Sequence, residues 1–313
     1  MRNLLAAMFL TGAIAIPGSA AWAACSVTLE GPNEVRFTGE SGSGYDTFSR
    51  SIYETPFSMT ITNLDESNAC EAVLSIQREP GRKGMIGPGP DRLLYEIAPP
   101  GDRSTIVDSE TVGRPPNALP FTVGPGQTIT RPLALRVLPG QSVPSGSYDE
   151  TLLVRLVEKD KGFDIVAERT LRIRTYVVQQ ASILLYDGAI TKPTPGDIGT
   201  RNRQLDFGTL EEGETGAVTV LVQSNDDYSL RIASANRGAL WHSVYGSSQP
   251  VSYRAYLNDR RLELGSGEDR VAGRPATGPA GAVMRLSVQI GTVGAARAGR
   301  YEDQLTISIL PDS

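Results

Sequence analysis

The sequence is poor in the residues that catalytic and metal sites use. Its 313 residues include one histidine and two cysteines. It has no Gly-x-Ser-x-Gly motif, no phosphate-binding loop and no histidine pair at a metal-ligand spacing. A serine–histidine catalyst would have to use His242, and a lone histidine is more often a surface or core residue. The acidic pairs Glu211-Glu212 and Asp226-Asp227 lack the spacing of a calcium loop and are interpreted as solvated turns. We therefore expect no enzyme activity, no cofactor and no bound metal.

Strong charge and long apolar runs are also missing. The 30 basic and 35 acidic residues give a net charge of −5, and no basic stretch suggests a nucleic-acid partner. The one apolar run, from Leu4 to Ile16, follows Arg2 and is too short to span a bilayer. It precedes a small-x-small site at Ala21-Trp22-Ala23. Residues 1–23 are therefore interpreted as a signal peptide, and the mature chain is expected to be exported.

The two cysteines, Cys25 and Cys70, both fall in the mature chain. In an oxidising compartment they most simply form one disulfide. Closing a loop of roughly 45 residues would stabilise the fold by up to about 4 kcal/mol. The alternative is a lipid on Cys25. This alternative is disfavoured because Trp22 stands where a lipoprotein signal has an aliphatic residue.

What the chain has in quantity is turn residues and alternating strands. The 33 glycines and 21 prolines separate short segments in which apolar and polar residues alternate. No stretch sustains a helical period. The pattern predicts an all-β protein with about seven strands per domain, arranged as sandwiches. The clearest strands are expected at 57–62, 72–76, 133–137, 152–156, 170–177, 217–222, 228–232, 251–257 and 284–290.

One strand signature occurs twice. Gly146-Ser147-Tyr148-Asp149-Glu150 and Gly299-Arg300-Tyr301-Glu302-Asp303 each precede an alternating apolar segment. A repeat of about 150 residues predicts two similar β domains in tandem. The first copy is followed by another long alternating segment at 170–177, whereas only four residues follow the second.

Two segments of the first half are longer than a turn requires, residues 81–90 and 99–121. Long loops on a sandwich often carry binding sites. Their apolar residues are candidates for gripping an apolar surface, although the same side chains would also suit the core. The candidates are Met85, Ile86, Pro88, Leu119, Pro120 and Phe121.

These features together resemble the spore coat protein U domain, which builds subunits of archaic chaperone–usher pili. The resemblance rests on a cysteine-started β domain, a second cysteine some 45 residues on, and the Gly-x-Tyr endings. Leu205-Asp206-Phe207-Gly208 is similar to the Phe-Gly strand end of that family, and Val35-Arg36-Phe37-Thr38-Gly39 departs from it. The resemblance covers two copies over the whole mature chain.

The resemblance implies two tandem immunoglobulin-like, pilin-type sandwiches. Residues 24–178 would form the first, completed in cis by a strand at about 165–178. Residues 179–313 would form the second, which lacks its last strand and needs a donor strand. The donor-strand groove would lie along Tyr301, Leu305, Ile307 and Ile309.

The expected function is that of a tip adhesin. Cys25 follows the expected cleavage site so closely that no N-terminal donor extension is expected, so the chain would accept a strand and give none. Its partners would be a periplasmic chaperone, an outer-membrane usher, an adjacent pilus subunit and an abiotic or host surface. Attachment at the cell surface would promote biofilm formation. The alternative is a structural pilus or coat subunit without a binding site.

Overall fold

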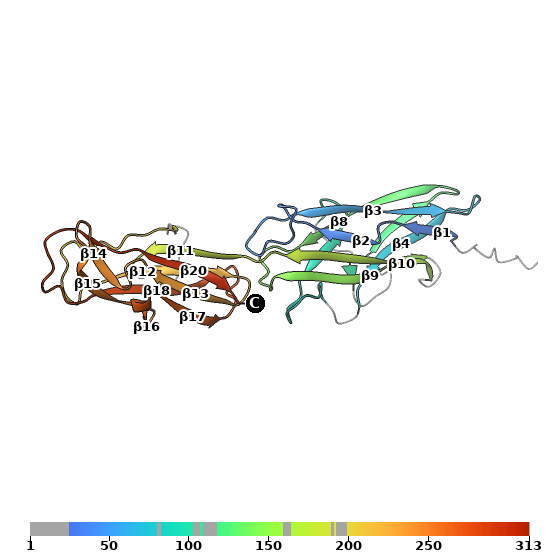
Figure 1. The fold of residues 1–313 in the computed structure, drawn as a ribbon. Helices are drawn as coiled ribbons and strands as arrows, with labels where there is room; N and C mark the ends of the chain where they lie inside the picture. The colour runs from blue at the N-terminus through green and yellow to red at the C-terminus, as the bar shows by residue number, and fades with distance from the viewer. Residues whose placement is uncertain are drawn as a thin grey trace, which may run out of the picture.

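The protein is almost entirely β-structure, arranged as two sandwiches joined end to end (Figure 1). The computed structural model describes residues 25–79, 83–102, 107–108, 118–158, 164–188, 191 and 199–312. The expected signal peptide, residues 1–23, and residues 103–106 and 109–117 of the expected loop at 99–121 lie outside the described residues. The first sandwich is defined here as residues 25–177 and the second as residues 181–312.

The first sandwich packs a sheet of order β1-β3-β8-β5 against a sheet of order β2-β10-β9-β4-β6, in which β7 also pairs with β4. Its strands are β1 (Val27–Glu30), β2 (Glu34–Phe37), β3 (Glu54–Asn63), β4 (Cys70–Gln77), β5 (Tyr95–Ala98), β6 (Val107–Asp108), β7 (Ala118–Val123), β8 (Thr128–Val137), β9 (Gly146–Glu158) and β10 (Ile165–Val177).

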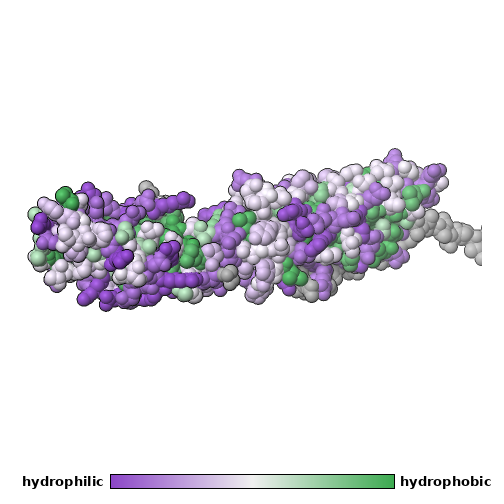
Figure 2. Space-filling model, viewed as in Figure 1, coloured by the Kyte–Doolittle hydropathy of each residue, from purple (hydrophilic) through white to green (hydrophobic). Residues whose placement is uncertain are grey.

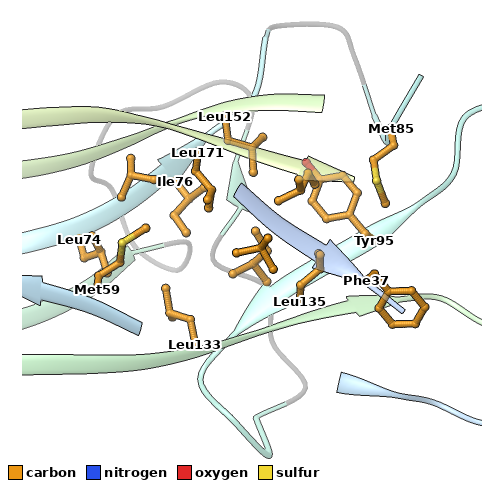
Figure 3. Close-up of a cluster of buried hydrophobic side chains, with 14 of the residues drawn as sticks. Phe37, Met59, Leu74, Ile76, Met85, Tyr95, Leu133, Leu135, Leu152 and Leu171 are labelled. Atoms are coloured by element: carbon orange, nitrogen blue, oxygen red, sulfur yellow. The ribbon is translucent and has the colours of Figure 1, made fainter. Parts of the chain in front are cut away.

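The core of the first sandwich follows from the alternation of these strands. In β10, Leu171, Ile173, Thr175 and Val177 are buried, and the residues that alternate with them face outward. Figure 3 shows Leu171 pointing into the same cluster as Leu152 of β9 and Ile76 of β4. The strand after the Gly-x-Tyr segment therefore contributes to the core between the two sheets.

The second sandwich also packs two sheets, and the sheet that corresponds to the one with β9 and β10 has three strands in the described chain. One sheet has the order β11-β12-β18-β15-β14-β19, with β16 beside β15, and the other has the order β17-β13-β20. Its elements are β11 (Ala181–Asp187), β12 (Thr215–Ser224), β13 (Tyr228–Ser234), β14 (Ala239–His242), β15 (Gly246–Leu257), β16 (Arg260–Leu262), the 3-10 turn η1 (Leu264–Ser266), β17 (Glu268–Arg274), β18 (Ala282–Ile290), β19 (Tyr301–Glu302) and β20 (Leu305–Pro311).

The disulfide expected from the sequence is present. Cys25 and Cys70 are bonded, with their Cα atoms 5.3 Å apart. The bond ties the segment before β1 to the start of β4, at the end of the first sandwich remote from the second. Among the residues with described coordinates, no helix has the length and apolar character needed to cross a membrane.

A connector of three residues, 178–180, joins β10 to β11. Asn225, 1% exposed, fixes it from the second sandwich. Its Nδ2 donates to the carbonyl of Val178 (2.9 Å), and its Oδ1 accepts from the amide of Gln180 (2.8 Å). The amide of Ser145, in the first sandwich, donates to Oδ1 of Asp226 (2.8 Å). The two sandwiches therefore contact each other at the base of β9 and the end of β12.

Candidate functional site

The repeated Gly-x-Tyr signature takes the same conformation in both sandwiches. Gly146 and Gly299 have φ angles of 131° and 149°, a region open to glycine. The hydroxyl of Tyr148 donates to the carbonyl of Pro144, four residues earlier (3.0 Å). The hydroxyl of Tyr301 accepts from the amide of residue 297, also four residues earlier (3.0 Å). The two signatures therefore mark equivalent points in the two folds.

A buried tyrosine beside a carboxylate is the second shared feature. Tyr95 of β5 and Tyr253 of β15 are 5% and 8% exposed. Tyr253 donates to the Asp303 carboxylate. Burial, and then this hydrogen bond, raise the pKa of Tyr253 above its usual range. Burial and the Glu150 carboxylate raise the pKa of Tyr95 in the same way. Glu150 and Asp303 each lie two residues after the repeated tyrosine, so the signature carries this contact as well.

The strands that follow the two signatures differ in their neighbours. In the first sandwich β9 pairs with β4 on one side and with β10 on the other, from Ile165↔Val157 to Val177↔Gly146. In the second sandwich β20 pairs with β13, from Tyr228↔Pro311 to Ser234↔Leu305. No other described strand pairs with β20. One edge of β20 is therefore free of backbone partners among the described residues.

The segment opposite β20 is unpaired as well. In the first sandwich β2 pairs in parallel with β10 and buries Val35 and Phe37. In the second sandwich Leu205 and Phe207 take the corresponding place, and both are partly buried against the core. Within the described chain, residues 201–208 make no backbone–backbone hydrogen bond. The second sandwich therefore lacks the one strand that would lie between 203–207 and β20.

The side chains along this gap are apolar and incompletely covered. We call them the acceptor groove; all are partly buried against the second core, in contrast to the fully buried Leu152, Val154 and Leu156 of β9. The groove consists of Ile183, Leu185, Leu205, Phe207, Leu305, Ile307 and Ile309. The sequence also assigns Tyr301 to the groove. Tyr301 lies in β19, at the end of the groove, and packs edge-on against His242, with ring centroids 5.0 Å apart.

Strand β10 shows what would fill the groove. It runs antiparallel to β9 and parallel to β2, and buries Leu171, Ile173, Thr175 and Val177. An added strand in the second sandwich would therefore run antiparallel to β20, with apolar residues at every second position. Because β20 runs toward the first sandwich, the C-terminal end of the added strand would emerge at the far end of the second sandwich, beside β14 and β19 (Figure 1).

Some of the surface-binding candidates are buried in the structure and others are exposed. Met85 is fully buried, as Figure 3 shows, and Phe121 is 6% exposed, so the expectation that they form exposed tips is wrong. Both belong to the core cluster of the first sandwich. Leu119, Pro120 and Phe121 lie in β7, an edge strand paired with β4.

Of the remaining candidates, Ile86 is 41% exposed and Pro88 is exposed. They lie near the second sandwich, because Ile86 bridges to Asp149 at the start of β9. Leu119 is half-buried and Pro120 is exposed on β7. The two segments therefore do not form one surface.

The other sequence candidates have structural partners. His242 is 5% exposed; its Nδ1 accepts from the amides of Val244 (3.0 Å) and Tyr245 (3.3 Å). It therefore holds the β14–β15 turn. Asp226 accepts from Ser145 at the junction. No group of three or more histidine, cysteine or acidic side chains suited to a metal ion occurs in the described part of the chain.

Four groove residues, Ile183, Leu185, Leu205 and Phe207, were not assigned to the groove from the sequence. Leu205 and Phe207 lie in a motif that the sequence singled out as a strand end. The sequence signal for them is a glycine shortly after the phenylalanine, Gly208 directly after Phe207 and Gly39 two residues after Phe37; in the structure these glycines have similar φ angles of 59° and 61°.

Comparison with known proteins gives structural likeness only. No protein-family model matches the chain, and no curated protein matches it. The CsuC–CsuE chaperone–tip adhesion subunit complex of archaic chaperone–usher Csu pili from Acinetobacter baumannii contains a chain of 15% identity. The alignment covers 91% of this chain and 99% of that one, with a TM-score of 0.42.

Two further adhesins have similar structures. The CupB6 tip adhesin of Pseudomonas aeruginosa has 12% identity over 91% of this chain and 95% of its own, with a TM-score of 0.39. CfaE, the adhesive subunit of CFA/I fimbria of enterotoxigenic Escherichia coli, has 11% identity over 92% of this chain and 82% of its own, with a TM-score of 0.33.

Proposed function

We propose that the chain is a non-enzymatic tip subunit of an archaic chaperone–usher pilus. Its second sandwich accepts a strand from the adjacent subunit, and its first sandwich carries the attachment surface for an abiotic or host surface. The observation that carries the proposal is the unpaired edge of β20 beside the partly covered acceptor groove. The proposal assigns this chain to the class of tip adhesins and to the spore coat protein U family.

An unpaired edge beside exposed core residues explains the expected partners. Such an edge pairs readily with other chains and promotes aggregation. A periplasmic chaperone that supplies a strand prevents this during export, and the outer-membrane usher exchanges it for the strand of the next subunit. The exported protein then promotes attachment and biofilm formation from the cell surface. The first sandwich needs no such partner, because β10 pairs along β9 and fills its core.

The junction restricts how the donor subunit lies. One end of the second sandwich faces the first, through Ser145 to Asp226 and through Thr47 Oγ1, which donates to Oε1 of Gln180 (3.2 Å). The donor subunit therefore lies beyond the far end. The turn there exposes Val244 (76%) and Tyr245 (51%), apolar surface that a neighbouring subunit would cover.

A structural pilus or coat subunit without a binding site is the second candidate. The burial of Met85 and Phe121 favours it, because two of the six surface-binding candidates are unavailable. Both candidates share the acceptor groove and differ in the role of the first sandwich.

The test supplies the missing strand in trans. A peptide with the β10 sequence, residues 170–177, is added to the mature chain, and a peptide with the apolar residues shifted by one position is the control. We expect the first peptide alone to raise the midpoint of one thermal transition and to protect β20 amides from hydrogen exchange. At 100 times its Kd the peptide would stabilise the sandwich by about 2.7 kcal/mol.

Substitutions locate the effect. Ile307→Asp should abolish peptide binding, because the side chain faces the groove, whereas Thr306→Asp, which alters an exposed neighbour, should not. A second sandwich that is equally stable with and without either peptide would contradict the proposal and indicate a closed fold.

A further inference from the structure

The outward face of β2, β10 and β9 concentrates arginine. Because side chains alternate along a strand, Arg172, Arg174 and Tyr176 point away from the core that Leu171 and Ile173 enter. Arg36 of β2 is exposed on the same face. Figure 2 shows strongly hydrophilic residues where Figure 1 draws β2 and the adjoining part of β10. We call Arg36, Arg172, Arg174 and Tyr176 the arginine face.

The register places two of these charges directly opposite each other. Arg174 pairs with Arg36, and Arg172 pairs with Glu34. Like charges at directly opposed positions destabilise a sheet. Two carboxylates lie nearby: Nε of Arg174 is 3.0 Å from Oε1 of Glu34, and Nη2 of Arg172 is 3.3 Å from Oδ2 of Asp149. Arg36 has no ion pair with any described residue, so the face keeps an unpaired positive charge on a protein of net charge −5.

The ion pairs on this face are open to exchange. The side chains of Arg172 and Asp149 are 50% and 45% exposed, and those of Arg174 and Glu34 are both 39% exposed. Ion pairs this exposed contribute little to stability, so an anion can replace a carboxylate at little cost. A shallow hollow lies over the face, lined by the three arginines together with Ser147, Asp149 and Tyr176.

We propose that the arginine face binds an acidic polysaccharide. Guanidinium groups bind carboxylate and sulfate oxygens in a two-pronged geometry, and Arg36 and Arg174 stand side by side to do so. Tyr176, 43% exposed at the end of the row, offers a ring on which a sugar packs. The ligand is a sugar chain with carboxylate or sulfate groups.

The size and charge of the site favour a sugar chain over other polyanions. Duplex DNA carries a charge about every 1.7 Å and is bound through many contacts, which three arginines on an acidic protein do not supply. A lipid surface would require several exposed apolar side chains beside the arginines, and the hollow offers a single exposed ring, that of Tyr176. The proposal is independent of the acceptor groove, because the face belongs to the first sandwich.

The test measures binding of the full mature chain, with the donor peptide present if the second sandwich requires it. The probes are polygalacturonate, dextran sulfate, uncharged dextran of matched size and a short DNA duplex. We expect binding to one or both acidic polysaccharides that weakens as salt is raised, and no binding to uncharged dextran. Which of the two binds more tightly distinguishes carboxylate from sulfate as the preferred group.

Variants tie the binding to the face. The double variant Arg36→Gln/Arg174→Gln should weaken polysaccharide binding at least tenfold. Its thermal midpoint should be unchanged or higher, because the like-charged pair is removed. The matched control is Arg254→Gln, an exposed arginine on β15 of the second sandwich, which should bind as the parent does. Inorganic sulfate should compete weakly with the polysaccharide for the arginines. Tyr176→Ala should weaken binding of the polysaccharide and leave this competition by sulfate unchanged.

Three results would overturn the proposal. Equal loss of binding in Arg254→Gln would show an effect of net charge alone. Binding of uncharged dextran as tightly as the acidic chains would remove the role of the arginines. Tighter binding of the DNA duplex than of either polysaccharide would replace the sugar chain with a nucleic acid.

Discussion

In the first sandwich β9 pairs with a strand on each side, whereas in the second sandwich β20 pairs on one side only, as far as the described residues show. The two share the Gly-x-Tyr turn, the buried tyrosine and one strand order, β1-β3-β8-β5 in the first sandwich and β11-β12-β18-β15 in the second. Their difference comes down to β10, which lies where the second sandwich has a gap. Under the proposed function, one fold thus has a self-sufficient form and a form that another chain completes, and the choice depends on a single strand.

The largest effect is expected from a substitution that disrupts β10, because the first sandwich would then lose the strand that distinguishes it from the second. Ile173→Asp places a carboxylate at a fully buried position and removes an isoleucine from the core. We expect the first sandwich to lose at least about 4 kcal/mol of stability and to aggregate. Thermal unfolding with sedimentation would measure both. The control, Thr170→Asp on the outward face of the same strand, should remain soluble.

The next largest effect is expected from removing the disulfide, which should lower the stability of the first sandwich alone. Cys25→Ala/Cys70→Ala opens a loop of sequence separation 45 and should destabilise the first sandwich by up to about 4 kcal/mol. The second sandwich, which contains neither cysteine, should unfold at an unchanged temperature. Calorimetry of the full chain would resolve the two transitions. A fall in both midpoints would mean that the sandwiches unfold as one unit.

The glycines of the two Gly-x-Tyr signatures, Gly146 and Gly299, should differ in how much stability an alanine substitution costs. A Cβ at Gly299 would lie 2.2 Å from Nε2 of His242, whereas at Gly146 it would lie 2.8 Å from Cγ of Pro88. Both have φ values that L-residues avoid, so alanine should cost about 1–3 kcal/mol at each. Because the contact is closer, Gly299→Ala should cost more. Chemical denaturation would measure it, and Gly265→Ala, with open space around it, should have little effect.

The smallest effect is expected at the tyrosine of the signature. Tyr148→Phe removes the hydrogen bond to Pro144 and should cost about 1 kcal/mol at neutral pH. Burial, followed by the charges of Asp226 and Asp91, raises the pKa of Tyr148 from 10.0 to about 12. A raised folded-state pKa gives stability that is complete below pH 10 and is lost as pH rises through about 12.

The pH dependence provides the check on that variant. Urea unfolding between pH 9 and pH 12 should show a steeper loss of stability for the parent than for Tyr148→Phe. Equal slopes would show that the hydroxyl is already accessible to solvent.

The strands that carry the comparison were predictable from the sequence. The spacing of Gly146-Ser147-Tyr148 and Gly299-Arg300-Tyr301 indicated the equivalence of β9 and the β19–β20 segment. The alternation at 170–177 indicated β10, and the cysteine count indicated the disulfide, which the structure contains. The strand signals are local, since each depends on a few residues adjacent in the chain, whereas the disulfide follows from there being only two cysteines to pair.

The burial of the loop candidates was not predictable in the same way. Pro120 suggested a loop, but an edge strand tolerates a proline because one side of its backbone needs no partner. Strand β7 is such an edge, so Phe121 and Val123 alternate into the core despite the proline. Leu205 and Phe207 were missed as groove residues for a different reason. Their segment lies outside the strands of the structure, and the alternation of Leu205, Asp206 and Phe207 is too short to show which part of the sandwich they face.

The continuity of β10 with β11 has a mechanical consequence. If the chain is a pilus tip subunit as proposed, and the first sandwich is held at a surface while the fibre is pulled from the far end, the load enters the first sandwich through the three-residue connector at the end of β10. That pull acts along the length of β10, so the hydrogen bonds to β9 and β2 bear it together in shear. The strand that completes the first sandwich is thus also the strand whose hydrogen bonds resist unfolding of that sandwich under load.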